Sequence, residues 1–209
     1  MTVCHNLRAF LMLIGVAVLF STLTACTILP EGEPVRAFLL PHEPLEERPG
    51  AAPLSQSLAI GTPRAGHILD SRRIAVVQDS EITSYRGARW ADLAPTLLRD
   101  RLIEAFQHVG QGSSVSSADA NLYADLQLDS RLRAFQSEYV DGTPTVLIRL
   151  DAQLVDNNTQ RILASRSFEV RKPSPDETIE SVVATFGRAS DDLSGEVVDW
   201  LLEQAGARD

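Results

Sequence analysis

The chain contains 209 residues, of which 44% are hydrophobic and 22% are charged, and its formal net charge at pH 7 is −9. This length is typical of one globular domain with its own core, and the hydrophobic fraction excludes an intrinsically disordered protein. The acidic balance disfavours a nucleic-acid-binding protein, which needs a basic face to displace counterions. The two cysteines cannot form a disulfide scaffold or a four-thiolate zinc site.

The N-terminus has the organisation of an export signal. Arg8 is the only charged residue before an apolar run at residues 9–20. This run is shorter than the ~20 residues that a helix needs to cross a bilayer, and it is typical of the hydrophobic region of a signal peptide. Residues 23–26 read Leu-Thr-Ala-Cys, and small residues before a cysteine resemble a bacterial lipobox. An ordinary secretory signal that happens to contain a cysteine is the alternative.

Cleavage before Cys26 would remove Cys4 and leave Cys26 to carry the acyl chains. We therefore predict a lipoprotein signal peptide at residues 1–25, a lipidated tether at 26–34 and one folded domain at 35–206. Several acyl chains, each contributing ~0.8 kcal/mol per buried methylene, would hold the protein firmly at a membrane surface. In the enteric sorting signal, an aspartate directly after the lipidated cysteine keeps a lipoprotein at the inner membrane. In this chain the residue after Cys26 is Thr27. By that analogy we expect an outer-membrane anchor with the domain facing the periplasm.

Short strands and one helix are predicted in the first half of the domain. The helix covers residues 92–109, where apolar side chains recur at three- and four-residue spacing, Pro95 falls in the first turn and Gly110 follows the end. An exposed loop rich in Pro and Glu is expected at residues 41–53. The predicted strands are residues 35–40, 57–60, 73–77 and 82–85.

The second half of the domain predicts a meander of three strands followed by a long helix. Residues 122–134, 145–155 and 162–170 alternate between apolar and polar side chains, as strands with one buried and one solvated face do. The helix is expected to begin with Ser174 as its N-cap and to run for about 30 residues, or ~45 Å. The fold class is therefore α/β in the broad sense (α+β): a mixed, largely antiparallel sheet flanked by two main helices in a single domain.

Few residues point to catalysis. The three histidines of the mature chain, His42, His67 and His108, lie far apart in the sequence and have no cysteine to assist them, so we predict neither a metal site nor a cofactor. The chain also lacks a nucleophile elbow and the glycine-rich loops that bind nucleotides. We predict that the protein is not an enzyme.

One local group of residues has two interpretations. Tyr85, Arg86, Arg89 and Trp90 precede the first predicted helix. In the structural interpretation, Trp90 packs where helix meets sheet and Arg89 pairs with a carboxylate or caps a carbonyl. In the functional one, the four side chains form a partner-binding surface, because Tyr, Trp and Arg dominate interface hot spots.

The order of several motifs resembles a known family. A lipobox is followed by a strand ending in Leu-Pro at residues 40–41, Arg-Ile-Ala at 73–75, Tyr85 with Ala-Arg-Trp-Ala-Asp at 88–92, and a terminal helix with Val-Asp-Trp-Leu at 198–201. This order resembles the ABC-type transport auxiliary lipoproteins, in particular the PqiC-like group, over about residues 35–205.

The resemblance implies a mixed sheet flanked by helices and a periplasm-facing lipoprotein without catalytic residues. Its expected partners are an MCE-domain protein, which forms a hydrophobic conduit for lipid between the two membranes, and an inner-membrane ABC-type or related permease. The lipoprotein would dock this conduit at the outer membrane. A lipid carrier with a groove between the terminal helix and the sheet is one alternative, a cell-envelope hydrolase is another, and homo-oligomerisation stays open.

Overall fold

The computed structural model describes residues 34–43, 54–109 and 114–206. The chain divides into an N-terminal unit, Met1–Pro34, and a compact domain, Val35–Asp209, and the elements described here belong to the second unit. The predicted signal peptide, Cys26 and most of the predicted loop at 41–53 lie outside the described residues. No helix in the described ranges is both long enough and apolar enough to span a membrane.

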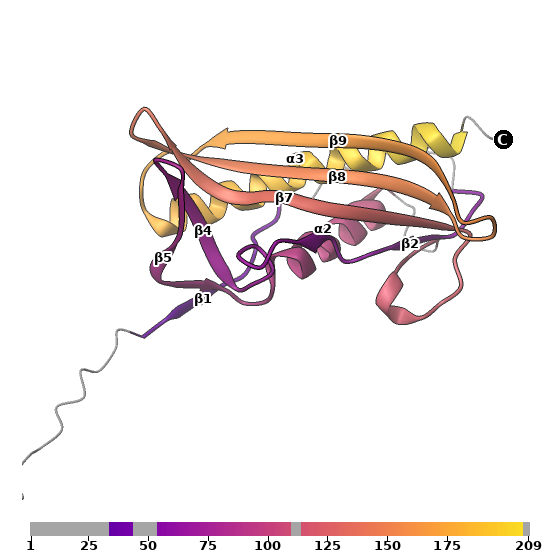
Figure 1. The fold of residues 1–209 in the computed structure, drawn as a ribbon, viewed down its shortest axis with the longest axis horizontal. Helices are drawn as coiled ribbons and strands as arrows, with labels where there is room; N and C mark the ends of the chain where they lie inside the picture. The colour runs from indigo at the N-terminus through magenta and orange to yellow at the C-terminus, as the bar shows by residue number, and fades with distance from the viewer. Residues whose placement is uncertain (1–33, 44–53, 110–113, 207–209) are drawn as a thin grey trace, which may run out of the picture. The chain divides into compact units, whose positions relative to one another are not determined.

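The domain combines one mixed sheet with two long helices (Figure 1), so the predicted fold class is confirmed. In chain order, the elements are β1 (Arg36–Phe38), β2 (Leu58–Ile60), β3 (Arg64–Ala65), β4 (Arg73–Gln78), β5 (Glu81–Trp90), α2 (Ala94–His108), β6 (Val115–Ser117), the 3₁₀ turn η2 (Ala118–Ala120), β7 (Leu126–Val140), β8 (Thr143–Asp156), β9 (Arg161–Pro173) and α3 (Ile179–Gly206).

Strand β7 organises the sheet. On one side it pairs antiparallel with β8, which pairs antiparallel with β9, and this confirms the predicted meander. On its other side β7 pairs in parallel with β2, β3 and β4. Strands β4 and β5 form an antiparallel hairpin, and β1 and β6 add short parallel pairings at β5 and β2. The short strands β2, β3 and β6 are thus held by β7 or by its neighbour β2, whereas β1 joins the sheet through β5.

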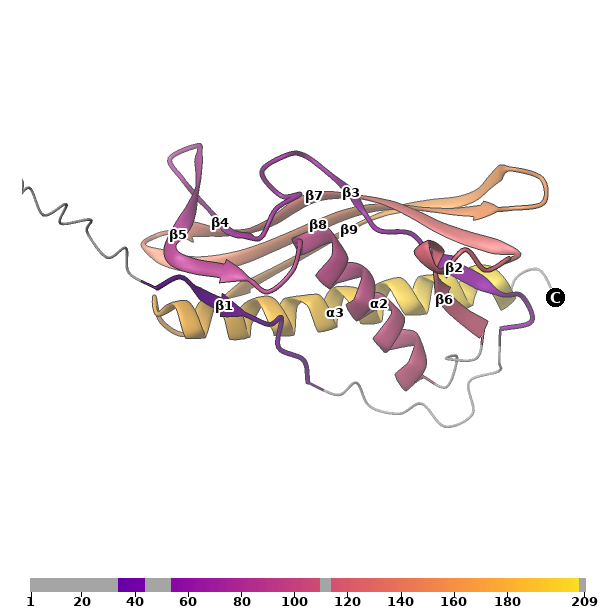
Figure 2. The same cartoon turned by 90° about the horizontal axis from the view of Figure 1, so that it is seen from below.

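Both helices lie on the same face of the sheet (Figure 2). The apolar stripe of α3 packs against the meander, and Val182, Phe186, Leu193 and Val197 are each 0% exposed. The predicted groove for a lipid between this helix and the sheet is therefore filled by core side chains. The opposite face of the meander faces solvent, as the alternation of polar residues predicts.

The first meander strand differs from its prediction at both ends. Leu122, expected on the buried face, precedes the strand and is 65% exposed. The strand also continues to Val140, beyond a shift in its register with β8 between Leu132 and Ala134. One extra residue in a bulge reverses which side chains face the core, so Phe135 is buried next to Ala134. The sequence prediction ended the strand where the simple alternation stops.

The second helix begins later than predicted. Ser174 is not its N-cap, because β9 continues to Pro173 and the Ser174 N–H donates to the Pro144 carbonyl at 2.8 Å. The helix begins at Ile179, and Thr178 accepts from the Val182 N–H through its carbonyl and from the Ser181 N–H through its hydroxyl. The residue that resembles an N-cap, Ser174, therefore bonds to strand β8 instead of starting the helix.

The segment after β1 is fixed between the two helices by a buried arginine. Arg101 of α2 donates from Nη2 to the carbonyls of Leu40 and Pro41 at 3.1 and 2.9 Å. Its Nη1 lies 3.3 Å from Asp191 Oδ1 of α3, and Asp191 Oδ2 accepts from the Glu43 N–H at 3.0 Å. Burial raises the pKa of Asp191, against the opposing effects of that N–H and of Arg101. The chain that leads away from the predicted anchor thus contacts both helices.

Candidate functional site

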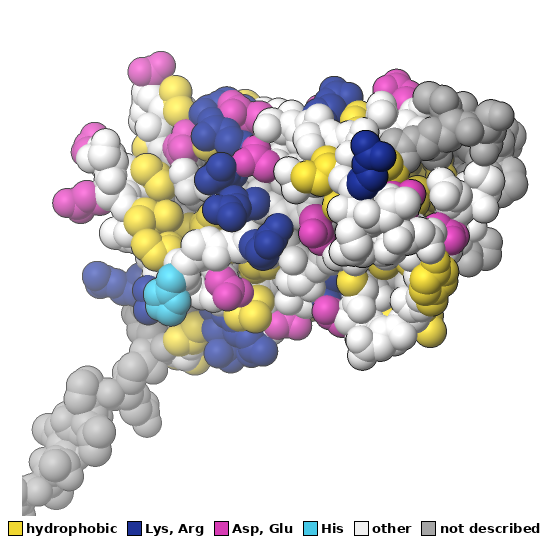
Figure 3. Space-filling view, turned by 45° about the vertical axis from the view of Figure 1, so that its right-hand side comes forward, with side chains coloured by type: hydrophobic (Ala, Val, Ile, Leu, Met, Phe, Trp, Pro, Cys, Tyr) yellow, Lys and Arg dark blue, Asp and Glu magenta, His cyan; other side chains and the backbone are white. Residues whose placement is uncertain are grey.

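The solvent face of the meander carries a ladder of charged side chains. Arg149 of β8 pairs with Glu169 of β9 at 2.6 Å, and Arg171 pairs with Glu169 at 2.9 Å and with Glu138 at 3.0 Å. Figure 3 shows Lys and Arg side chains in a band across the molecule, interspersed with Asp and Glu. Hydrogen bonds from Arg149 and then Arg171 lower the pKa of Glu169. At this end of the ladder every arginine named here has a carboxylate partner.

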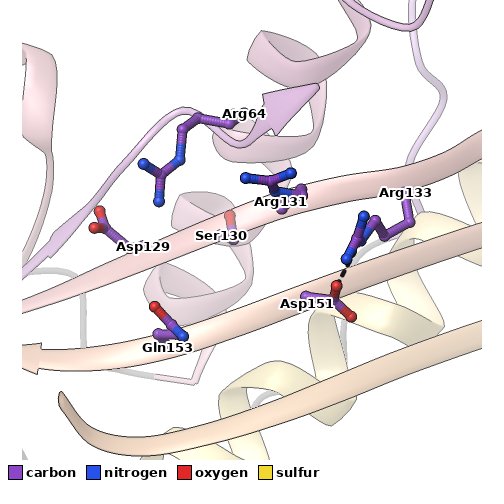
Figure 4. A pocket seen from close by; sticks show the side chains of 7 residues that line it. All are labelled: Arg64, Asp129, Ser130, Arg131, Arg133, Asp151 and Gln153. Atoms are coloured by element: carbon purple, nitrogen blue, oxygen red, sulfur yellow. Dashed lines mark hydrogen bonds and ion pairs between the residues drawn. The ribbon is translucent and has the colours of Figure 1, made fainter. Parts of the chain in front are cut away.

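The other end of the ladder is hollowed (Figure 4). A depression of about 390 Å³ opens over β3, β7 and β8, and a second one of about 420 Å³ adjoins it. Both are lined by Arg64, Arg131 and Arg133, and we call the combined depression the arginine hollow. The first part is also lined by Asp129, Ser130, Asp151 and Gln153, and the second by Ala65, Gly66, Leu69 and Leu132.

Only one of the three arginines in the hollow is neutralised. Arg133 Nε lies 2.6 Å from Asp151 Oδ2, and Ser167 Oγ donates to Asp151 Oδ1 at 2.8 Å. These hydrogen bonds, the one from Arg133 first, lower the pKa of Asp151, and the charge of Arg131 adds to the effect. Within the described ranges, Arg64 and Arg131 form no ion pair. The hollow therefore presents two guanidinium groups that have no ion-pair partner among the described residues.

The pairing of strands places these two charges side by side. Arg64 of β3 is the register partner of Arg131 of β7. Asp129, two residues before Arg131, accepts a hydrogen bond from Gln127 Nε2 at 2.7 Å. Guanidinium groups present fixed forks of N–H donors and bind oxyanions, and they do not act as general acids or bases in proteins. In the described part of the chain, no three His, Cys, Asp or Glu side chains gather in a way that could hold a metal ion. The arrangement is suited to anion binding.

The four residues singled out from the sequence do not form one surface. Trp90 is 0% exposed and packs against Phe135 and Phe186, with ring centroids 5.8 and 5.2 Å away. Tyr85 is half-buried, its hydroxyl lies 3.0 Å from Ser137 Oγ, and burial raises its pKa. Both aromatic side chains therefore contribute to the core side of β5.

The two arginines of that group are exposed. Gly87, with a φ of 67°, lies between Arg86 and Arg89, in the stretch where the β4–β5 register shifts from the Arg73–Arg89 pair to the Ala75–Ser84 pair. Arg89 is the register partner of Arg73, and neither forms an ion pair in the described residues, so the predicted carboxylate partner of Arg89 is not found there. Of the predicted set, Arg86 and Arg89 are the residues that a partner can reach, and their role stays a prediction.

The arginine hollow was only partly visible in the sequence. Asp129, Arg131 and Arg133 fall on the polar side of an alternating segment, where solvation alone explains them. Arg64 belongs to a strand of two residues, which has no periodic signal of its own. A long-range parallel pairing brings it to Arg131, and such pairings leave no local mark in the sequence.

Comparison with known proteins identifies the family. Residues 38–198 match the family model of the ABC-type transport auxiliary lipoprotein component. The chain belongs to this family. An uncharacterized protein of Bradyrhizobium diazoefficiens is 30% identical over 154 residues, which are 74% of this chain and 41% of the relative. The chain thus spans about two fifths of the length of this curated relative.

Solved structures agree with the family assignment. A protein from Xanthomonas campestris is 30% identical, with a TM-score of 0.76 over 83% of this chain and 98% of that one. A further uncharacterized protein is 14% identical, with a TM-score of 0.61 over 79% of this chain and 99% of the other, and it shows the fold alone. The resemblance deduced from the motif order is confirmed at the level of the family.

Proposed function

We propose that this auxiliary lipoprotein is a non-catalytic component of a lipid transport system that docks an MCE-domain protein at the outer membrane. An inner-membrane ABC-type or related permease would hold the MCE-domain protein, and Cys26 would carry the acyl chains that anchor the lipoprotein facing the periplasm. The observation that carries the proposal is the family match over residues 38–198, together with the lipobox that ends at Cys26.

The surface of the domain supports docking better than lipid carriage. Arg86 and Arg89 stand exposed on β5, next to a core that includes Trp90. A carrier needs an apolar cavity that buries much of its ligand. The apolar stripe of α3 instead packs against the sheet, and Phe186 and Leu193 in this stripe are completely buried. The hydrolase alternative finds no support from a metal cluster, because no three His, Cys, Asp or Glu side chains in the described ranges gather in a way that could hold a metal ion.

Anchoring is tested first on the full-length chain. A Cys26→Ser variant should lack the acyl chains that the wild type carries. Mass spectrometry of the N-terminal peptide should find acyl groups on Cys26 in the wild type. An unmodified thiol in the wild-type peptide would contradict the predicted anchor and leave the docking proposal without its outer-membrane location.

Docking is tested by capture of the MCE-domain protein from the same organism, expressed together with the full-length lipoprotein. Substituting Arg86→Glu and Arg89→Glu together should weaken capture at least about tenfold, because reversed charges at an interface oppose association. Arg161→Glu and Arg166→Glu together, at exposed positions on β9, reverse the same number of charges and are the matched control, which should leave capture unchanged. Failure of the wild type to capture the partner would overturn the proposal.

A further inference from the structure

The arginine hollow has charges that the fold itself does not need. Arg64 and Arg131 occupy directly opposite positions on β3 and β7. Like charges that face each other across neighbouring strands destabilise a sheet. Farther along the same face, Arg149 and Arg171 each have a carboxylate partner, Arg149 at 2.6 Å from Glu169. A pair of unneutralised arginines in an acidic protein therefore indicates an external anion.

The nearby carboxylates do not supply that anion. Asp151 already accepts from Arg133 and from Ser167, so its two oxygens are occupied. Asp129 accepts from Gln127 and forms no ion pair within the described ranges. With three arginines and two aspartates, the lining keeps an excess of positive charge. The groups that remain free to bind are the guanidiniums of Arg64 and Arg131 (Figure 4).

We propose that the arginine hollow binds a phosphate ester through Arg64 and Arg131, with Arg133 as a third, partly engaged cation. Two adjacent guanidinium forks can bind one oxyanion together, and a phosphate monoester offers three unesterified oxygens and a charge of about −1.5 to −2 near pH 7, against two oxygens and a single charge for a carboxylate. The advantage of phosphate over a side-chain carboxylate is therefore largest for a monoester. This inference is independent of the docking function proposed above.

The shape of the hollow accommodates the group esterified to the phosphate. Beyond the arginines, the depression continues along Ala65, Leu69 and Leu132. Gly66 also lines this part, and a Cβ added there would meet nothing within 4 Å, so the floor is open at this point. Its volume of about 420 Å³ falls in the range of small-ligand sites. The apolar lining can contact the carbon atoms of the ester, which belong either to a soluble phosphate ester or to a phospholipid headgroup region.

The test measures binding to the full-length lipoprotein in a non-ionic detergent by calorimetry. The probes are inorganic phosphate, glycerol 3-phosphate and dihexanoyl phosphatidylglycerol, whose short chains keep it monomeric, and hexaglutamate represents an acidic protein segment. We expect saturable binding of at least one phosphate probe. Preference for dihexanoyl phosphatidylglycerol would identify a lipid headgroup as the source, and equal or tighter binding of glycerol 3-phosphate would identify a soluble ester.

Variants locate the binding. Arg64→Gln and Arg131→Gln should each weaken phosphate binding at least about tenfold, since each removes one charged fork. Arg131→Lys keeps the charge without the fork and should lie between the wild type and Arg131→Gln. Arg149→Gln removes the same charge from the same face, at a residue that has its own carboxylate partner, and should change binding by less than about threefold.

Folding is followed in the same samples. The thermal midpoints of Arg64→Gln and Arg131→Gln should match or exceed that of the wild type, because each variant relieves a like-charge contact. Absence of saturable binding for all three phosphate probes would overturn the proposal. Equal losses in Arg149→Gln would also overturn it, because binding would then reflect the overall charge. Tighter binding of hexaglutamate than of every phosphate probe would replace the phosphate site by a surface for an acidic partner.

Discussion

Two glycines of α3 make a sharp test of how the segment after β1 is held. A Cβ at Gly187 would lie 2.5 Å from the Pro41 carbonyl oxygen and 3.1 Å from its carbonyl carbon. A Cβ at Gly195 would meet nothing within 4 Å. Both positions lie inside the same helix, so the helix propensity gained on substitution by alanine is about the same at each, roughly 1 kcal/mol.

The expected stabilities of the two variants therefore have opposite signs. Gly195→Ala should raise the free energy of unfolding by about 0.5–1 kcal/mol. Gly187→Ala must move the backbone at Pro41, and overpacking of this kind costs about 1–3 kcal/mol. After subtraction of the helix gain of roughly 1 kcal/mol, the net loss should reach up to about 2 kcal/mol. In a domain of this size each kcal/mol shifts the thermal midpoint by about 2–4 °C.

Thermal and urea unfolding of the purified variants measure the difference. The clash acts through the carbonyl that Arg101 holds at 2.9 Å, so the effect of Gly187→Ala should shrink in an Arg101→Met background, where Pro41 is free to shift. A gain of stability at Gly187 equal to that at Gly195 would refute the reasoning, because Pro41 could then not be packed against α3 as described. Full additivity with Arg101→Met would show that the arginine does not fix this segment.

Three further predictions concern the core, the buried pair of Arg101 and Asp191, and the charged ladder. Trp90→Ala should lower the free energy of unfolding by about 3–5 kcal/mol in urea titrations, because a fully buried indole leaves a cavity between Phe135 and Phe186, whereas Arg89→Gln should change it by less than about 0.5 kcal/mol; equal effects would contradict the division of this group into core and surface. Arg101→Met should cost about 3–5 kcal/mol at pH 7 by leaving Asp191 without its buried partner, and Asp191→Asn in the same background should recover part of that loss. Hydrogen bonds from arginine hold the pKa of Asp151 and of Glu169 below their unfolded values, so both carboxylates stabilise the fold above about pH 4 and this stability is lost as the pH falls through their lower folded pKa values. Acid unfolding of Asp151→Asn should accordingly show a weaker pH dependence below about pH 4 than that of the wild type, and an unchanged profile would show that its pairing with Arg133 contributes nothing.

The sequence predicts those elements whose signal is local. The helix at residues 92–109 is found within two residues at its start and one at its end because its apolar spacing and the following glycine are strong signals. Strand β8 is found within two residues at its start and one at its end, because apolar and polar residues alternate from Ile148 to Leu154. Where a bulge intervenes, as between Leu132 and Ala134, the period of two changes phase and the prediction ends early.

The parts that depend on distant pairing could not be predicted. Strands β3 and β6 have two and three residues, and their strand conformation comes from pairing with β7 and β2. Ser174 followed by proline resembles a helix start, yet its N–H donates a hydrogen bond to the Pro144 carbonyl of the neighbouring strand. The candidate site shares this limitation, because Arg64 reaches Arg131 only through the β3–β7 pairing.

The distribution of charge restricts what the basic band can bind. The net charge of −9, summed over the whole chain, disfavours binding of nucleic acid. A local basic face could still attract a polyanion. Such a polymer needs a continuous row of free cations to contact successive phosphates. Along this band Glu138, Glu169 and Asp151 neutralise the intervening arginines, which interrupts the row and leaves the free pair at Arg64 and Arg131. Two adjacent guanidiniums match one isolated phosphate group, so the pattern of carboxylates along the ladder selects a small phosphate ester over a nucleic-acid backbone.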